Sequence, residues 1–127
     1  MLCARQCIYF YYMTKRNKNQ GLSTFTARLD RALDSDLFKT LSESIRCKIL
    51  RIVAINGPMD VMSVAEYFSQ DRSVISRHLT MMAAAGILKS EKNKRSKIYW
   101  VNGPAILEKL ERMTETVRFL TECKCDD

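Results

Sequence analysis

The chain has 127 residues, which suffices for one domain with tails but leaves no length for a second globular unit. Its formal net charge is +7 at pH 7, because 21 lysines and arginines outnumber 14 acidic residues, and this favours a polyanionic partner without separating DNA from RNA or an anionic membrane surface. A single histidine and the lack of a nucleophile–base pair, phosphate loop or carboxylate dyad leave little for catalysis, so we expect no enzyme.

Residues 1–23 are predicted to be a flexible tail. The opening residues 1–13 contain one short apolar run, well below the roughly 18 apolar residues that a spanning helix needs, and no small-residue cleavage site follows it. Met13 is an alternative start of translation. The five cysteines have no spacing typical of a small disulfide framework. We therefore expect no membrane anchor and a reducing, cytoplasmic location.

Two scaffold helices are predicted next. The first covers residues 24–41, and we expect its apolar face to be buried. The second begins at Ser44, which we expect to cap it, and ends at Asn56-Gly57-Pro58. The apolar positions recur at helical spacing: Phe25, Leu29, Leu33, Leu37 and Leu41 in the first helix, and Ile45, Ile49, Ile52 and Val53 in the second.

A helix-turn-helix follows. A short third helix is predicted over residues 62–69, with Val64, Ala65 and Phe68 on its inner side. Asp71 stands where an N-cap belongs, and we expect its side chain to accept a hydrogen bond from an early amide of a fourth helix. That helix runs to Ala85 and ends with Gly86 at the C′ position. Two helices joined by about three residues are typical of DNA-reading domains.

The fold class that these elements predict is mainly α with a small β-hairpin, in the order ααααββα. The hairpin pairs residues 87–91 with residues 97–101, and a final helix runs from Pro104 to about Glu122. The domain thus spans residues 24–122, before a cysteine-containing tail at 123–127. The apolar stripes of the first and last helices are wider than a small core can cover, which predicts a homodimer. The stripe of the last helix contains Ile106, Leu107, Leu110, Met113, Val117 and Leu120.

Three segments together resemble the ArsR/SmtB-type repressor family: residues 43–50 at the start of the second helix, the Ser-x-His-Leu and Gly-hydrophobic pattern of residues 76–79 and 84–88, and the return strand 97–102. The similarity covers about residues 29–120. It implies a winged helix-turn-helix fold and a dimeric transcriptional repressor. It also implies release from a double-stranded DNA operator when a metal ion, metalloid or other inducer binds.

The fourth helix is the predicted reading element. Arg72, Ser73, Ser76 and Arg77 would contact base edges or phosphates, and Val74 a thymine methyl, whereas Ile75 and Leu79 would face inward. We expect the hairpin residues Lys92, Lys94, Arg95 and Lys97 to contact phosphate or the minor groove. The alternative is that both groups are ordinary solvated surface. RNA binding is disfavoured, because most aromatic residues fall at helix-core positions or in the N-terminal run rather than at exposed stacking positions.

The other aromatic side chains of this region are predicted to be structural. Tyr99 and Trp100 alternate along the return strand, so one should be core and the other partly exposed. We expect His78, the lone histidine, to pack behind the reading helix or to bond to backbone rather than to act as a ligand.

The inducer site departs from the family pattern. The usual Cys-Val-Cys of the third helix is Ser63-Val64-Ala65 here, and the last helix has no histidine for a zinc site. Cys123 and Cys125 remain as candidates for binding As(III), Cd(II) or another soft ion, or for reversible oxidation. Cys47 is a third candidate, with the alternative that it is a small packed hydrophobe. Cys3 and Cys7 are expected to be irrelevant. A DNA-binding module without a small-molecule effector, controlled by a protein partner, is the competing function.

Overall fold

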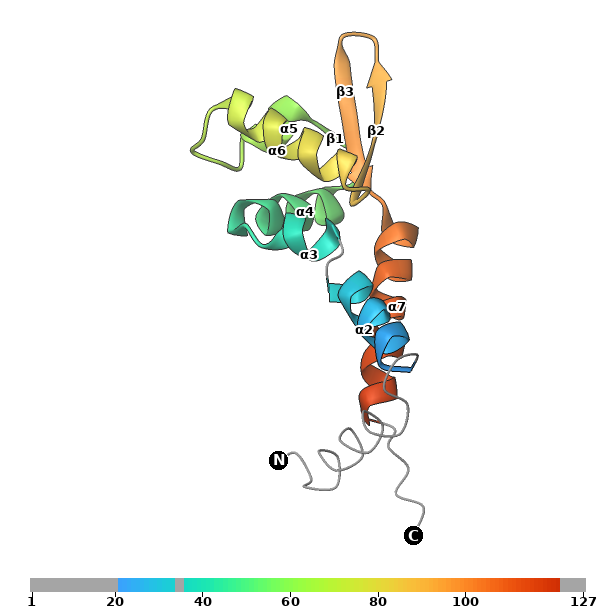
Figure 1. The fold of residues 1–127 in the computed structure, drawn as a ribbon. Helices are drawn as coiled ribbons and strands as arrows, with labels where there is room; N and C mark the ends of the chain where they lie inside the picture. The colour runs from blue at the N-terminus through green and yellow to red at the C-terminus, as the bar shows by residue number, and fades with distance from the viewer. Residues whose placement is uncertain (1–20, 34–35, 122–127) are drawn as a thin grey trace. The chain divides into compact units, whose positions relative to one another are not determined.

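The computed structural model describes residues 21–33 and 36–121, which fall into two compact units. One unit is Ser35–Lys109, and the described part of the other is α2 with the C-terminal part of α7 (Figure 1). The elements are α2 Gly21–Leu33, α3 Asp36–Leu41, α4 Ser44–Asn56, β1 Met59–Asp60, α5 Val61–Ala65, α6 Arg72–Ala84, β2 Leu88–Asn93, β3 Ser96–Val101 and α7 Gly103–Thr121. The predicted winged helix-turn-helix is confirmed.

The single helix predicted over residues 24–41 is wrong, because the structure has two helices, α2 and α3, in this range. Asp34, Ser35 and Asp36 favour helix N-termini over helix interiors, and Asp36 lies in the first turn of α3. The apolar face is also only partly buried: Leu37 is 2% exposed, whereas Leu33 is 51% exposed. Among the described residues of this face, Leu37 thus lies in the core and Leu41 packs against it.

The start of α4 is fixed by a buried arginine rather than by a serine cap. The N-cap residue is Glu43 and not the predicted Ser44, and its side chain makes no capping hydrogen bond. Arg46 is 5% exposed; its guanidinium donates to the Thr40 carbonyl and pairs with the Glu43 carboxylate at 3.1 Å. Arg46 therefore joins the end of α3 to the start of α4. The predicted end of α4 is confirmed by Gly57, which has a φ of 79° and donates its N–H to the Val53 carbonyl.

A short strand, β1, was not predicted from the sequence. It pairs antiparallel with β3, Met59 opposite Tyr99 and Asp60 opposite Ile98, so the sheet has the order β1-β3-β2. Two residues are too few to produce an alternating pattern. Asp60 then caps α5, since its Oδ1 accepts a hydrogen bond from the Ser63 N–H at 2.8 Å. α5 ends at Ala65, before the predicted residue 69.

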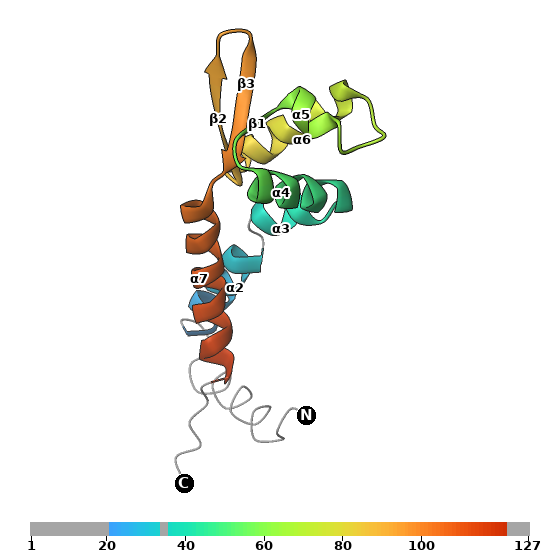
Figure 2. The same ribbon diagram turned by 180° about the vertical axis from the view of Figure 1, so that it is seen from behind.

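The core of the larger unit lies between α3, α4, α5, α6 and the inner face of the hairpin (Figures 1 and 2). It includes the predicted inward residues Ile75 and Leu79, both 0% exposed, and Tyr99 at 2%. Trp100 is half-buried, which confirms the predicted division of roles between the two aromatic residues of β3. The buried apolar residues are Leu37, Ile49, Ile52, Val53, Met59, Val64, Ile75, Leu79, Met82, Ile87, Leu88 and Tyr99.

Replacing Asp60 tests the cap of α5. Asp60→Ala should lower the free energy of unfolding by about 1 kcal/mol, whereas Asp60→Asn, which can also cap, should cost less. The Ser63 amide holds the pKa of Asp60 below its ordinary value. This contribution is therefore present at pH values above the ordinary Asp range and is lost as pH falls through the folded-state pKa. Urea unfolding of wild type and Asp60→Asn from pH 7 to pH 3 should show their difference shrinking; a constant difference would contradict the assignment.

Candidate nucleic-acid interface

The reading helix α6 has two chemically different sides. Ile75, Leu79 and Met82 are fully buried on one side, whereas Arg72, Ser73 and Arg77 are exposed on the other. The remaining two predicted contact residues, Val74 and Ser76, are half-buried at the boundary. The first half of α6 thus presents two guanidinium groups and a hydroxyl to solvent, and these are the groups that hydrogen-bond base edges and phosphates.

The N-cap of α6 is Asp71, as predicted, but the predicted side-chain hydrogen bond is wrong. The Asp71 side chain makes no capping bond, and its backbone carbonyl accepts hydrogen bonds from the Val74 N–H at 2.9 Å and the Ile75 N–H at 3.2 Å. Further along α6, His78 is half-buried, and its Nδ1 has no hydrogen-bond partner among the described residues. His78 is therefore packed, one of the two roles predicted for it, rather than bonded to backbone through this atom.

The wing is the hairpin of β2 and β3. Asn93 pairs with Ser96, so Lys94 and Arg95 form a two-residue turn, and Lys94 takes the required positive φ of 52°. Lys92 stands directly opposite Lys97 on the same face, and both side chains are exposed. Like charges in this arrangement repel each other and weaken the hairpin. A polyanion placed against this face would remove that penalty.

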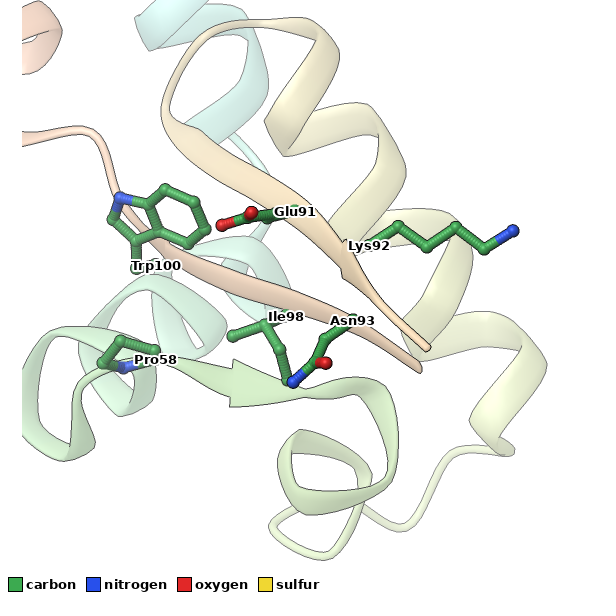
Figure 3. Close-up of a pocket in the computed structure, with 6 residues that line it drawn as sticks. All are labelled: Pro58, Glu91, Lys92, Asn93, Ile98 and Trp100. Carbon is green, nitrogen blue, oxygen red and sulfur yellow. The ribbon is translucent and has the colours of Figure 1, made fainter. Parts of the chain in front are cut away.

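The two faces of the wing differ in charge. Strand alternation puts Lys92 and Lys97 on the same face as Leu88 and Tyr99, both of which are buried in the core. Figure 3 shows Lys92 pointing away from Glu91 and Trp100, which lie on the opposite face. An open depression of about 460 Å³ lies at this part of the wing, lined by Pro58, Glu91, Lys92, Asn93, Ile98 and Trp100. Lys92 and Lys97 therefore lie on the face of the wing that packs against the core, to which α6 also contributes.

Comparisons with known proteins agree with this geometry. Residues 43–90, which cover α4, the helix-turn-helix and the start of the wing, match the family model "Bacterial regulatory protein, arsR family". This segment is therefore similar to the ArsR family of regulators. The geometry and this match together support a DNA-binding winged helix-turn-helix transcriptional regulator.

Individual relatives extend over most of the chain. An uncharacterized HTH-type transcriptional regulator of Methanocaldococcus jannaschii, MJ1325, is 27% identical over 81 residues, which are 64% of this chain and 91% of that protein. A solved ArsR-like transcriptional regulator from Rhodococcus sp. RHA1 is 28% identical, with a TM-score of 0.57 over 70% of this chain and 87% of its own. The homodimeric winged helix-turn-helix domain Mb0332 from Mycobacterium bovis has a TM-score of 0.52 and 17% identity, over 80% of this chain and 88% of its own. This similarity is one of fold.

Residues Ser63-Val64-Ala65, which stand where the ArsR pattern has Cys-Val-Cys, have structural roles in this protein. The backbone N–H of Ser63 donates a hydrogen bond to the Asp60 carboxylate. Val64 is 0% exposed in the core, and Ala65 packs against the core. Within residues 21–33 and 36–121, no three histidine, cysteine, aspartate or glutamate side chains come together as a group that could hold a metal ion.

The predicted packing of Cys47 is wrong. Cys47 is exposed on α4, and its Sγ donates to the Leu41 carbonyl at 3.1 Å. Burial depends on the helix face: Arg46 and Ile49 take the inner side and leave Cys47 on the solvent side. The other four cysteines, Cys3, Cys7, Cys123 and Cys125, lie outside the described residues. In the part of the chain that the structure covers, no helix combines the length and apolar character needed to cross a membrane.

Proposed function

We propose that this chain is a transcriptional repressor of the ArsR type, and that α6 contacts bases in the major groove of operator DNA while the wing binds the adjacent backbone. The observation that carries the proposal is the two-sided structure of α6, in which Ile75 and Leu79 are buried and Arg72 and Arg77 are exposed. Because this burial fixes the rotation of α6 about its axis, the arginines and Ser73 face outward together. Helix-turn-helix proteins read DNA with residues at the start of such a helix.

The wing supports backbone binding rather than base discrimination. Its four basic residues, Lys92, Lys94, Arg95 and Lys97, are all exposed, and two of them repel each other across the strands. Each phosphate that a lysine or arginine neutralises releases counterions, so affinity gained in this way is independent of sequence and depends strongly on salt. Base contacts from α6 and phosphate contacts from the wing would therefore contribute separable parts of the binding free energy.

Two variants should separate these contributions on an operator recovered by selection from random DNA. Arg77→Ala should lower discrimination between operator and random DNA by about 1–3 kcal/mol if its guanidinium contacts a base edge. Lys92→Gln should weaken binding to both DNAs alike and reduce the salt slope by about 0.9 for each bound subunit, while stabilising the free protein by a few tenths of a kcal/mol. Fluorescence anisotropy over a salt series measures both effects. Equal binding of wild type to operator and random DNA would contradict base reading.

A homodimer is the assembly that this proposal requires. α7 exposes Leu107, Leu110 and Val117 on one stripe, with exposed fractions of 57%, 43% and 42%. Contiguous apolar surface of this kind marks an interaction site, and the Mycobacterium bovis relative is described as homodimeric. A two-fold dimer presents two reading helices to successive half-sites of a palindromic operator.

Leu110→Glu tests the dimer. A charge in the centre of the stripe should raise the dimer dissociation constant by about 30-fold or more, which corresponds to about 2 kcal/mol. Sedimentation equilibrium from 1 to roughly 100 µM measures it. Glu115→Gln, exposed on α7 away from the stripe, is the matched control and should behave as wild type. A wild-type chain that remains monomeric throughout would overturn the proposal.

We propose further that Cys123 and Cys125 sense the inducer, either by binding a soft ion such as As(III) or Cd(II) or by oxidation. Two thiols separated by one residue can chelate a soft ion with a third donor. The support is chemical: Ser63 and Ala65 replace the thiols of the usual ArsR site, and the last helix has no histidine. Binding must favour the arrangement of the dimer that does not bind DNA, since equal affinity for both arrangements shifts nothing.

Operator release by the Cys123→Ser/Cys125→Ser variant decides this question. The variant should bind operator as wild type does but lose release by As(III), Cd(II) or a disulfide-forming oxidant, measured by gel shift at one salt concentration. Cys47→Ser is the control, because Cys47 is an exposed thiol on α4, and it should keep release. If the double variant still releases operator DNA as wild type does, the thiol mechanism is wrong. A wild type that no inducer releases would instead favour control by a protein partner.

A further inference from the structure

The C-terminal end of α6 is held by donors from the start of α7. α6 ends in a Schellman motif: Gly86, with a φ of 77°, donates its N–H to the Ala83 carbonyl at 3.1 Å, and the Ile87 N–H donates to the Met82 carbonyl at 3.0 Å. These bonds satisfy the Met82 and Ala83 carbonyls in the last turn of α6. The carbonyls of Ala85, Gly86 and Ile87, where the chain leaves the helix for the wing, need other donors.

Two side chains supply those donors. Lys109 Nζ donates to the Ala85 carbonyl at 3.1 Å, and Asn102 Nδ2 donates to the Gly86 carbonyl at 3.0 Å. The backbone N–H of Asn102 donates to the Ile87 carbonyl at 2.9 Å. Three successive carbonyls after the reading helix are therefore bound by a residue just before α7 and by one in its second turn.

Lys109 is placed for this role by its neighbours on α7. Leu107 and Leu110 are exposed, whereas Lys109 is half-buried, and Ile106 packs against the core on the same side. Its ammonium lies at the negative end of the α6 dipole, where a cation is stabilising. Lys109 is also the last residue of α7 within the compact unit Ser35–Lys109. The remainder of α7, with the apolar stripe from Leu110 onward, belongs to the other unit.

We propose that Lys109 and Asn102 are positioning residues for DNA reading, which set the orientation of α6 through its C-terminal end without touching DNA. The inner face of α6 fixes the rotation of the helix, and the carbonyls of residues 85–87 fix the position of its end. A helix end held by three hydrogen bonds is ordered before DNA arrives, so binding does not have to order it. Without these donors, the C-terminal end of α6 would have to be ordered when DNA binds, and the cost of that ordering would weaken the measured affinity.

The inference rests on α6 being the reading helix, and the test separates the two claims. Lys109→Met removes the donor but keeps most of the side-chain volume, and it should reduce operator affinity by roughly tenfold. The salt slope should not change, whereas removing a lysine in direct phosphate contact would lower the slope by about 0.9 for each bound subunit. Lys109→Arg, which can still donate to the Ala85 carbonyl, should restore most of the affinity. A reduced slope would assign Lys109 to the DNA interface and overturn the positioning role.

A second variant guards against a simple loss of folding. Asn102→Asp removes the Nδ2 donor at constant size and keeps the backbone N–H, and it should weaken operator binding in the same way. Because both residues act on one helix end, the double variant should lose less than the product of the two single losses. Circular dichroism gives the folded fraction for correcting each affinity. Corrected affinities equal to wild type in both single variants would mean that the two bonds serve stability alone.

Amide hydrogen exchange gives the independent readout. In Lys109→Met, the amides of Gly86 and Ile87, which close the Schellman motif, should exchange faster, while amides in the middle of α4 keep their rates. Unchanged exchange at Gly86 and Ile87 would overturn the inference even if affinity fell. Failure of Arg77→Ala to affect discrimination would count against the reading role of α6 and would leave the exchange result intact.

Discussion

The burial of one side of α6 is the constraint on which the rest of this structure depends. Ile75, Leu79 and Met82 each reach 0% exposure, and every methylene that they bury contributes about 0.8 kcal/mol to folding. A rotation of α6 that exposed them would cost several kcal/mol, a large part of the stability of a domain of this size. Because Ile75, Leu79 and Met82 occupy the buried side of α6, the side chains of Arg72 and Arg77 point to solvent. The same hydrophobic contacts that fold the domain define the surface that meets DNA.

The wing depends on α6 through the turn that joins them. Gly86 adopts a positive φ, which glycine tolerates without the strain of a Cβ, and it directs the chain from helix to strand at Leu88. The strand register then follows from burial, because Leu88 and Tyr99 must both face the core. A slip of one residue would move Lys92 and Lys97 to the outer face beside Trp100. The position of the charged pair is thus a consequence of core packing several residues away.

The elements that bury a regular apolar pattern could be predicted from the sequence, and those fixed by single polar contacts could not. α4, α6 and the hairpin followed from periodicity and from Gly57 and Gly86, because these features are local. β1 is held by pairing with a strand some 40 residues later, and the start of α4 depends on Arg46 reaching the Thr40 carbonyl. The division between α2 and α3 conflicts with an apolar spacing that runs through both helices. In each case the deciding interaction is either distant in sequence or made by a residue type that periodicity ignores.

The candidate interface likewise contains residues that could be predicted from the sequence and residues that could not. Exposure of Arg72, Ser73 and Arg77 was predictable, since it complements the burial of Ile75 and Leu79. The roles of Lys109 and Asn102 were not, because a lysine in a helix gives no sign in the sequence that it reaches a carbonyl 24 residues earlier. A half-buried lysine beside exposed leucines is a signal that only the fold reveals.

Residues 63–65, where the ArsR pattern has Cys-Val-Cys, tolerate different side chains in this fold. The fold makes two demands on residues 63–65. The backbone N–H of residue 63 donates to the N-cap residue Asp60, and residue 64 must have an apolar side chain. Residues 63 and 65 are half-buried, so their side chains can change without loss of the cap or of the central core contact. Serine and alanine therefore satisfy the same structural demands that two cysteines would. Side chains at residues 63 and 65 can therefore change while α6, the turn at Gly86 and the wing remain unchanged.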